Sequence, residues 1–379
     1  MASNVHMTGW ASALGGACLV VYGGAACALG AESDAVRRGQ ACAIPAAVLP
    51  APAAKADADA DKGAAAPAEP PKDEGATGGK GVIINAESAV YEAWRLPENF
   101  KSPNGSINEV SLVAQQKKRL DVMNEKLSAR FKLIETTHYL IFSDAPAAVT
   151  TSFKGMCEAL YANLRKQFAI GESERIWDGK CILVLFGTRD VFLKYAKTFD
   201  GHDAAAAGAY FAWECNDPKL PQLVHICIPT DKGGPKRLEE LFAHEGTHAF
   251  FQLYKKPVML PLWLHEGLAE YMTVVNDPAL KPKKEAWAIY LARKGADIHD
   301  VLTSPPGAGF TWPAYNVSYT LVDFLLSGVG WNAKFKKFVE LLKAGKNQDE
   351  AITEAYGFSI ADLQERWRVY CRDVLPNSR

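Results

Sequence analysis

The segment His-Glu-Gly-Thr-His, residues 244–248, carries side chains that could bind a metal ion. His244 and His248 are one helical turn apart, so on a helix their imidazoles project from one face and can converge on one ion. Glu245 lies about 100° around the helix axis, where its carboxylate could hold a water molecule between metal and substrate. The chain has only 8 histidines, and this spacing arises by chance in roughly one chain in 100 of such composition.

A catalytic zinc ion keeps three protein ligands and leaves one position for water, so a third ligand is needed. Glu266, in the segment Trp-Leu-His-Glu-Gly, is the natural supplier. Pro257 and Pro261 are expected to break the first helix, and a second helix beginning near Pro261 can fold back across it. Glu270 lies one turn beyond Glu266 and could accept a proton from the far nitrogen of a liganding histidine, fixing its tautomer. The alternative to a metal site is that residues 244–248 belong to an amphipathic helix whose histidines are solvated.

The surrounding pattern predicts a sheet first and helices afterwards. Apolar runs typical of strands alternate with amphipathic segments typical of helices. The expected strands are 137–143, 181–187, 207–213 and 223–229, and the expected helices are 146–168 and 189–197. A turn-rich segment between the last two strands indicates an antiparallel hairpin. After Gly233-Gly234-Pro235 the pattern is helical nearly to the end, and Pro235 suits a first helical turn.

The N-terminal residues differ in composition from the rest. Residues 10–30 carry no charge and include Ala26-Cys27-Ala28, which fits a cleavage site, so residues 1–31 are interpreted as a signal peptide or apolar N-terminal segment. If it is not cleaved, the segment is long enough to span a bilayer and would hold the protein at a membrane or the cell envelope. The other alternative is a disordered Gly/Ala-rich start. Export would place the protein in the periplasm, in the cell envelope or outside the cell. Residues 32–82, rich in Ala, Pro, Asp and Lys, are expected to be a disordered linker.

Residues 83–135 are expected to form a helical lead-in, with an amphipathic helix over 108–133. The formal charge of the chain is -1, from 42 basic and 43 acidic residues. No basic cluster is interleaved with aromatic residues, so nucleic acid is not an expected partner.

The cysteine spacing does not indicate a zinc knuckle or a redox pair, because no two cysteines of the part expected to fold form a Cys-x-x-Cys motif. These cysteines are Cys157, Cys181, Cys215, Cys227 and Cys371. Most are expected to be small buried apolar residues, with one or two disulfides if the protein is exported.

The two motifs together, His-Glu-Gly-Thr-His and Trp-Leu-His-Glu-Gly-Leu-Ala-Glu-Tyr, resemble the gluzincin metallopeptidases of the MA clan. The similarity is strongest to a small peptidase-like family with a Trp-Leu-x-Glu-Gly-x-Ala-Glu-Tyr second helix, and it covers about 136–375. It implies zinc (Zn²⁺) bound by His244, His248 and Glu266, with Glu245 as general base and Glu270 behind the ligands.

The resemblance also implies a fold and a domain plan. The fold class is α+β and zincin-like: a small mixed sheet with helices, the two motif helices, and a mostly helical C-terminal subdomain. Residues 136–232 would form the α/β part of the catalytic domain and residues 233–379 the helical part with the zinc site. In such a fold an antiparallel edge strand before the motif helix can take an extended peptide as another strand. Here that edge would be the strand at 223–229 or its hairpin partner.

Tyr315 follows the Glu266 helix and could stabilise an oxyanion in the transition state, with Tyr319 as the alternative. The side chain of His265 points about 100° away from that of Glu266, so His265 is expected at the surface or in a cleft.

These features predict a zinc metallopeptidase that acts on a peptide or protein substrate through metal-activated water, with Glu245 as general base. An endopeptidase is favoured, because the Gly-x-Met-Glu-Asn segment with which related aminopeptidases read a free amino terminus is missing from the sequence. Two other hypotheses stay open. One is a catalytically inactive zincin-fold binding or scaffolding protein of the cell envelope. The other is a structural metal in a closed four-ligand site.

Overall fold

The computed structural model describes residues 66–67, 82–83, 91–214, 219–255, 258–305 and 309–377. The segment 1–31, interpreted above as a signal peptide or apolar segment, lies outside the described residues, as does most of the expected linker. Within the described part of the chain, no helix combines the length and the apolar composition needed to cross a membrane.

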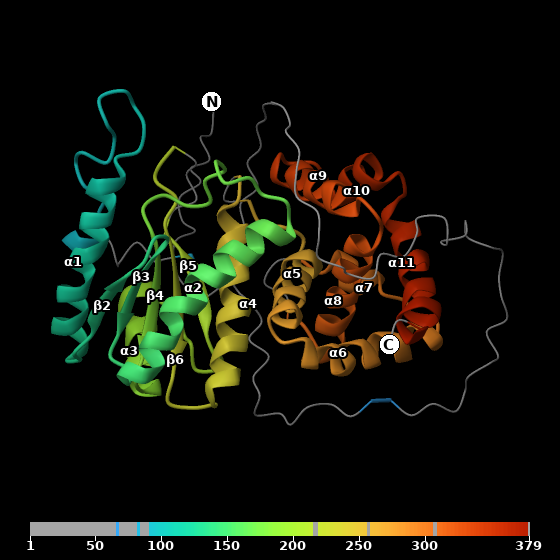
Figure 1. Cartoon of the computed structure of the whole chain (residues 1–379), viewed down its shortest axis with the longest axis horizontal. Coiled ribbons are helices and arrows are strands. Elements are labelled where there is room, and N and C mark those ends of the chain that lie inside the picture. Colours follow the sequence, from blue (N-terminus) through green and yellow to red (C-terminus); the bar gives the residue numbers. More distant parts are fainter. Residues whose placement is uncertain are drawn as a thin grey trace, which may run out of the picture.

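The N-terminal half is built on a mixed six-stranded sheet with the strand order β1-β5-β6-β4-β3-β2 (Figure 1). The strands are β1 Val82–Ile83, β2 Lys132–Glu135, β3 Tyr139–Ser143, β4 Cys181–Phe186, β5 Tyr210–Trp213 and β6 Val224–Pro229. Strands β3, β4 and β6 are parallel, whereas β2 pairs antiparallel with β3 and β5 pairs antiparallel with β6. Every residue of the three parallel strands is buried, which explains their continuous apolar sequences.

The expected hairpin forms, but neither of its strands is the outermost strand of the sheet. β6 lies between β5 and β4, so the alternative that placed the edge at 223–229 is wrong. β5 lies near the edge, and Ala212 and Trp213 on its outer side pair in parallel with Val82 and Ile83 of β1. β1 was not predicted, because two residues are too few to leave a periodic pattern.

Helices cover both faces of the sheet (Figure 1). α1 Glu109–Leu127, α3 Arg189–Tyr195 and the π-helix η4 Ala196–Asp200 lie on one face, and α2 Ala147–Gln167 and α4 Pro235–Leu253 lie on the other. Successive residues of β3 enter the two cores: Ile141 packs with α2 and α4, and Phe142 packs with α1 and α3. Such alternation is expected of a strand that is buried on both faces. The sheet therefore fixes α4, which carries the two motif histidines.

The predicted helix over 108–133 is shorter than expected. It ends at Leu127, and Ser128 adopts a left-handed conformation with φ 55°. The side chain of Asn124 then binds the backbone N–H and carbonyl of Phe131, which turns the chain back toward the sheet. Residues 132–135 pair with β3 as strand β2, and the half-buried side chains of Leu133 and Ile134 pack against the cores on the two faces of the sheet.

The C-terminal half is helical. Its α-helices are α5 Leu262–Asn276, α6 Lys281–Arg293, α7 His299–Thr303, α8 Trp312–Ser327, α9 Trp331–Lys343, α10 Gln348–Tyr356 and α11 Ile360–Val369. Shorter helical segments are η3 Glu92–Trp94, η5 Pro278–Leu280, η6 Tyr370–Val374 and η7 Leu375–Asn377. In Figure 1, α5 lies between α4 and α8. The α+β, zincin-like fold class is confirmed.

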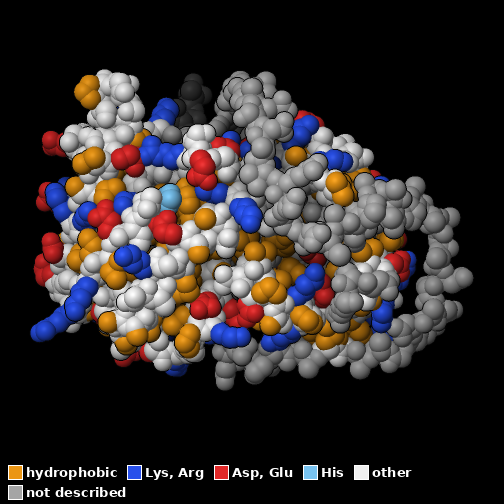
Figure 2. Space-filling view, viewed as in Figure 1, with side chains coloured by type: hydrophobic (Ala, Val, Ile, Leu, Met, Phe, Trp, Pro, Cys, Tyr) orange, Lys and Arg blue, Asp and Glu red, His pale blue; other side chains and the backbone are white. Residues whose placement is uncertain are grey.

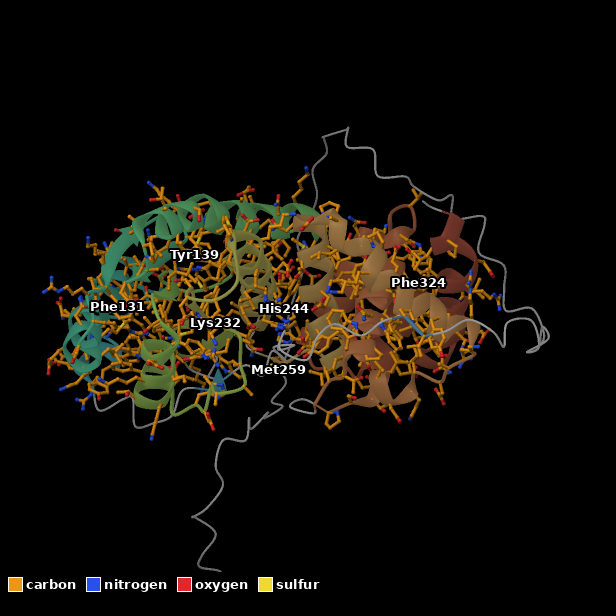
Figure 3. All side chains as sticks on the ribbon, turned by 90° about the horizontal axis from the view of Figure 1, so that it is seen from below. Phe131, Tyr139, Lys232, His244, Met259 and Phe324 are labelled. Carbon is orange, nitrogen blue, oxygen red and sulfur yellow. The ribbon has the colours of Figure 1, made fainter. Side chains whose placement is uncertain are left out.

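The two halves meet along α4 and α5. Figure 3 places Phe131 and Tyr139 in the sheet half, Phe324 in the helical half and His244 at the junction between them. On the face shown in Figure 2, acidic and basic side chains are interspersed over the sheet half, in keeping with the formal charge of -1.

A buried ion network stabilises the sheet half on the face away from α4. Arg119 makes a bidentate ion pair with Glu214, and His225 lies 2.9 Å from Asp200, which also accepts a hydrogen bond of 2.6 Å from Tyr210. Burial alone would lower the pKa of His225, but the Asp200 carboxylate raises that pKa well above its ordinary value. Burial raises the pKa of Glu214, but Arg119 outweighs it and lowers that pKa to about 2. The network therefore consists of alternating charges.

The cysteines that the structure describes behave as small apolar residues. Cys157, Cys181, Cys227 and Cys371 are buried free thiols. Cys215 lies outside the described residues.

We predict that Glu214→Gln lowers the free energy of unfolding by about 3–5 kcal/mol, because it leaves the buried guanidinium of Arg119 without its carboxylate. Urea denaturation followed by circular dichroism measures this change. Glu125→Gln is the matched control, because Glu125 is an exposed residue of α1, and its stability should equal that of the wild type. A Glu214→Gln protein as stable as the control would contradict the structural role of the network.

Candidate metal centre

α4 begins where the sequence predicted, with Gly234 before the helix and Pro235 in its first turn. His244 and His248 point the same way from this helix, and their Nε2 atoms are 3.0 Å apart. His244 is 6% exposed and His248 is fully buried. The alternative in which these histidines are solvated is therefore wrong, and two imidazoles share one enclosed space.

α5 brings Glu266 to the same point. Its Oε2 atom lies 3.5 Å from Nε2 of His244 and 3.4 Å from Nε2 of His248. A tetrahedral zinc ion with ligand bonds of about 2.0–2.2 Å holds its ligand atoms about 3.3 Å from one another. The three side chains thus form a triangle of the size that zinc requires. They are one of two groups in the described residues that could hold a metal ion.

The turn between the two helices differs in detail from the prediction. α4 ends at Leu253, before the expected helix breaker Pro257, which lies outside the described residues. Lys255 adopts a left-handed conformation with φ 68°, and its ammonium pairs with Glu174 at 2.5 Å. This ion pair ties the turn to the sheet half. Pro261 then precedes the first residue of α5, as expected.

Gly267, next to the candidate ligand Glu266, lets α5 approach α8 closely. A Cβ atom at this position would lie 2.8 Å from the carbonyl carbon of Ser318 in α8 and closer still to its oxygen. Real Cβ atoms do not approach a backbone so closely, so only glycine fits. The contact with α8 therefore fixes the position of α5, and with it the position of the Glu266 carboxylate.

Glu270 lies behind His244, as the sequence predicted. Its Oε1 atom is 3.3 Å from Nδ1 of His244, and its Oε2 atom makes an ion pair with Lys284 of α6. Burial raises the pKa of Glu270, but Lys284 and His244 outweigh it and lower that pKa to about 2. Glu270 is thus a carboxylate that can hold the proton of His244 on Nδ1 and leave Nε2 for a metal. Lys284 was not predicted, because nothing in the local spacing links it to Glu270.

Glu245 and Tyr315 both lie beside the candidate ligands. Glu245 is fully buried, and its charge is one of the causes that raise the pKa of His244. Burial raises the pKa of Tyr315 above its ordinary range, and the carboxylates of Glu266, Glu270 and Glu245 raise it further. The hydroxyl of Tyr315 therefore keeps its proton, within the electrostatic influence of these three carboxylates.

Tyr319, the alternative to Tyr315, belongs to another environment. It lies one turn further along α8, and its pKa is raised by burial and then by Asp323 and Glu285, not by the carboxylates of the site. Its ring lies 6.4 Å from that of Tyr271. The carboxylates of the site thus raise the pKa of Tyr315 and are not among the causes that raise the pKa of Tyr319.

His265 is buried rather than at the surface or in a cleft, so its predicted position is wrong. It is 1% exposed, and its ring stacks on that of His248 with centroids 4.2 Å apart. Phe211 of β5 lies 5.5 Å from the ring of His248 and 5.9 Å from that of His265. Burial, together with the charge of His248, lowers the pKa of His265 well below its ordinary value. A neutral imidazole and a phenyl ring therefore form one dry wall of the site.

A second group in the described residues has suitable side chains for a metal, namely Asp200, His225 and Cys227. It lies in the core on the opposite face of the sheet. Asp200 and His225 are already engaged with each other and with Tyr210 and Glu214 in the ion network. Charge balance within that network explains the cluster without a metal.

The fold and this site define a class. An α+β protein with two histidines from one helix and a glutamate from the next, around a common point, is a zincin-like protein. Residues 239–373 match the family model described as Peptidase MA superfamily. The match covers most of α4, the whole of α5 and the helices that follow, and it supports a peptidase-type function. Comparison with curated proteins gives no match for the chain.

We predict that Gly267→Ala lowers the free energy of unfolding by about 1–3 kcal/mol, because the added methyl group overlaps the backbone of α8. Gly155→Ala is the matched control: Gly155 lies in α2 with open space around its Cβ position, so alanine should raise stability by about 0.5–1 kcal/mol. Thermal and urea unfolding measure both. Equal responses of the two variants would contradict the close approach of α5 to α8.

Proposed function

We propose that the protein is a zinc-dependent metallopeptidase of the gluzincin type that cleaves internal peptide bonds of a peptide or protein substrate. One observation carries the proposal: the Nε2 atoms of His244 and His248 and the Oε2 atom of Glu266 lie 3.0–3.5 Å from one another in a buried space. The family match across both helices supports the same reaction class. Export, inferred from the uncharged residues 10–30, is part of the proposal.

The site suits a zinc ion with an open position. His244, His248 and Glu266 would hold the ion, and in the described part of the chain no fourth metal-binding side chain joins this group. Three protein ligands are typical of catalytic zinc, whereas structural zinc has four. When bound, zinc supplies Lewis-acid activation of a water molecule and of the scissile carbonyl. This composition favours a catalytic role over a closed structural site.

The residues around the ligands would transfer the proton, stabilise the transition state and orient the ligand His244. Glu245 would accept the proton of the attacking water and pass it to the leaving amine. The protonated hydroxyl of Tyr315 would donate a hydrogen bond to the oxygen that becomes negative in the transition state. Glu270 would hold His244 in the tautomer that presents Nε2, and Lys284 would keep Glu270 ionised. The dry wall of Phe211 and His265 strengthens each of these electrostatic interactions.

We predict that Glu245→Gln keeps the bound zinc and lowers kcat/KM by roughly 10²- to 10⁴-fold, whereas His244→Ala loses the zinc as well as activity. Elemental analysis of the purified protein measures the metal, and cleavage of a peptide library with and without a zinc chelator measures the activity. Full activity of Glu245→Gln, or cleavage that a chelator does not stop, would refute the proposed mechanism.

We predict that Tyr315→Phe lowers kcat by roughly 10²- to 10³-fold with little change in KM, because its hydroxyl acts mainly in the transition state. Tyr319→Phe is the matched control, since it removes a hydroxyl that is also buried and lies one turn along the same helix. Its kcat should stay within about 3-fold of the wild type, the range expected when no transition-state donor is lost. Equal losses in the two variants would assign both tyrosines a structural role.

A further inference from the structure

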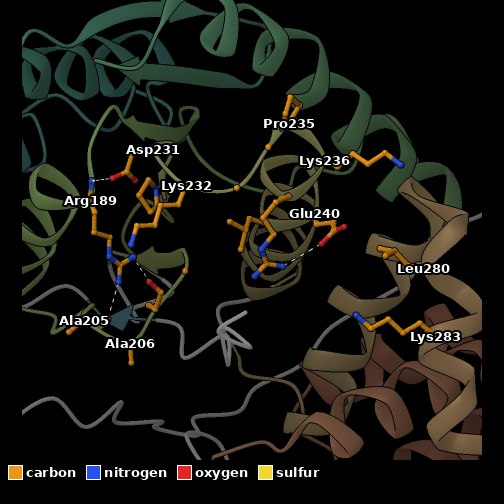
Figure 4. Close-up of a pocket in the computed structure, with 17 residues that line it drawn as sticks. Arg189, Ala205, Ala206, Asp231, Lys232, Pro235, Lys236, Glu240, Leu280 and Lys283 are labelled. Atoms are coloured by element: carbon orange, nitrogen blue, oxygen red, sulfur yellow. Dashed lines mark hydrogen bonds and ion pairs between the residues drawn. The ribbon is translucent and has the colours of Figure 1, made fainter. Parts of the chain in front are cut away.

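A cavity of about 890 Å³ opens between the sheet half and the helical half (Figure 4). One wall consists of residues 205–208 before β5 and residues 231–234 before α4. The opposite wall includes Leu280 and Lys283, from η5 and α6. The first turns of α4 lie between the two walls. Residues of both halves thus enclose one space near the start of the motif helix.

The cavity lies in line with the candidate metal ligands. Arg237, Glu240 and Leu241 of α4 line it, and His244 follows Glu240 by one helical turn on the same face. The helix advances about 6 Å from Glu240 to His244. An extended peptide advances about 3.3 Å per residue, so a substrate side chain in the cavity would belong to a residue about two to four positions from the bond at the metal site.

The lining of the cavity carries an excess of positive charge. Five basic residues, Arg189, Lys232, Lys236, Arg237 and Lys283, face two acidic ones, Asp231 and Glu240. Both acidic groups have partners: Glu240 lies 3.4 Å from Arg237, and Asp231 accepts a hydrogen bond from the backbone N–H of Arg189. Of the other basic groups, Lys236 lies 3.8 Å from Asp277, outside the lining, which leaves Arg189, Lys232 and Lys283.

In the described part of the chain, the side chains of three basic residues of the cavity lie within ion-pair distance of no carboxylate. The guanidinium of Arg189 donates to the carbonyls of Ala204, Ala205 and Ala207, which fixes it in one wall. Lys232 is exposed in the same wall, and Lys283 lies 5.4 Å from the ring of Trp312 and extends from the opposite wall (Figure 4). A ligand carboxylate in the cavity would be attracted by all three groups, because each adds positive potential to the lining.

We propose that this cavity binds an acidic side chain of the substrate, so that the protein prefers peptides with Asp or Glu about two to four residues from the cleaved bond. The inference rests on the proposed peptidase function. The N-terminus of α4 adds to the attraction, because the helix dipole places partial positive charge at that end. Lys232 and Lys283 are the specificity-determining residues, since both are exposed basic side chains of the lining, one from each wall.

The experiment compares fluorogenic peptides that are identical except for Glu, Gln or Lys at one position, which is moved stepwise along both sides of the cleaved bond. For the wild-type, zinc-loaded full chain, we expect kcat/KM to be at least about 10-fold higher with Glu than with Gln at the matching position, as one well-placed charge contact allows. In the double variant Lys232→Glu/Lys283→Glu this ratio should fall below one.

The control is Lys118→Glu/Lys132→Glu, which makes the same change in net charge at two exposed lysines of α1 and β2, outside the cavity. It should keep the wild-type ratio of Glu to Gln peptides. Loss of the preference in this control as well would show a general effect of net charge and would overturn the assignment to the cavity.

Binding to the Glu245→Gln protein separates the two proposals, because it requires no turnover. Fluorescence anisotropy at low and high salt should show tighter binding of the Glu peptide, with a difference that shrinks as salt screens the charges. Equal cleavage and equal binding of Glu and Gln peptides would overturn the cavity proposal and leave the peptidase proposal standing. If the Glu peptide binds in a way that depends on Lys232 and Lys283 but no peptide is cleaved, the peptidase proposal is overturned and the cavity still binds acidic peptides.

Discussion

The contact between α4 and α5 concentrates negative charge in a dry space, and the rest of the site depends on how that charge is balanced. Glu245, Glu266 and Glu270 are all buried there. A buried carboxylate is tolerated only with a positive partner. Lys284 supplies one positive charge at Glu270. The imidazoles, or a divalent cation between them, must supply the rest, so the geometry that brings the carboxylates together is also a geometry that attracts a metal ion.

Each half of the protein fixes one of the two helices. α4 packs its phenylalanines against the sheet, whereas α5 is held by the backbone of α8 at Gly267. The metal-binding atoms therefore meet only when both halves are in place, and distances of 3.0–3.5 Å among them depend on packing far from the ligands. The sheet half then contributes a second element, because Phe211 of β5 closes the site beside His248.

The sequence predicted what depends on local spacing. The histidines four residues apart, Glu266 at the start of the next helix and Glu270 one turn later all follow from the helical repeat, and the apolar runs marked the central strands. The sequence did not predict features that depend on how a helix is rotated about its axis or on contacts between elements far apart in the chain. Lys284 comes from a third helix, and the burial of His265 depends on which side of α5 faces β5. The cavity is formed by four segments that are separate in the sequence, so no local pattern could predict it.

A single rigid helix connects substrate selection with the proposed chemistry. The stripe of α4 that begins with Arg237 and Glu240 in the cavity continues through His244 to His248, so the distance between the cavity and the metal ligands is fixed by the helical rise. A loop could shift such a spacing, but a continuous 19-residue helix that is buried from Leu241 to Leu253 cannot. The charges are also ordered along this stripe, with basic groups around the N-terminus and carboxylates beside the histidines. An acidic side chain bound at the basic groups would therefore be held away from the carboxylates beside the histidines. This separation gives the substrate one favoured register along the helix.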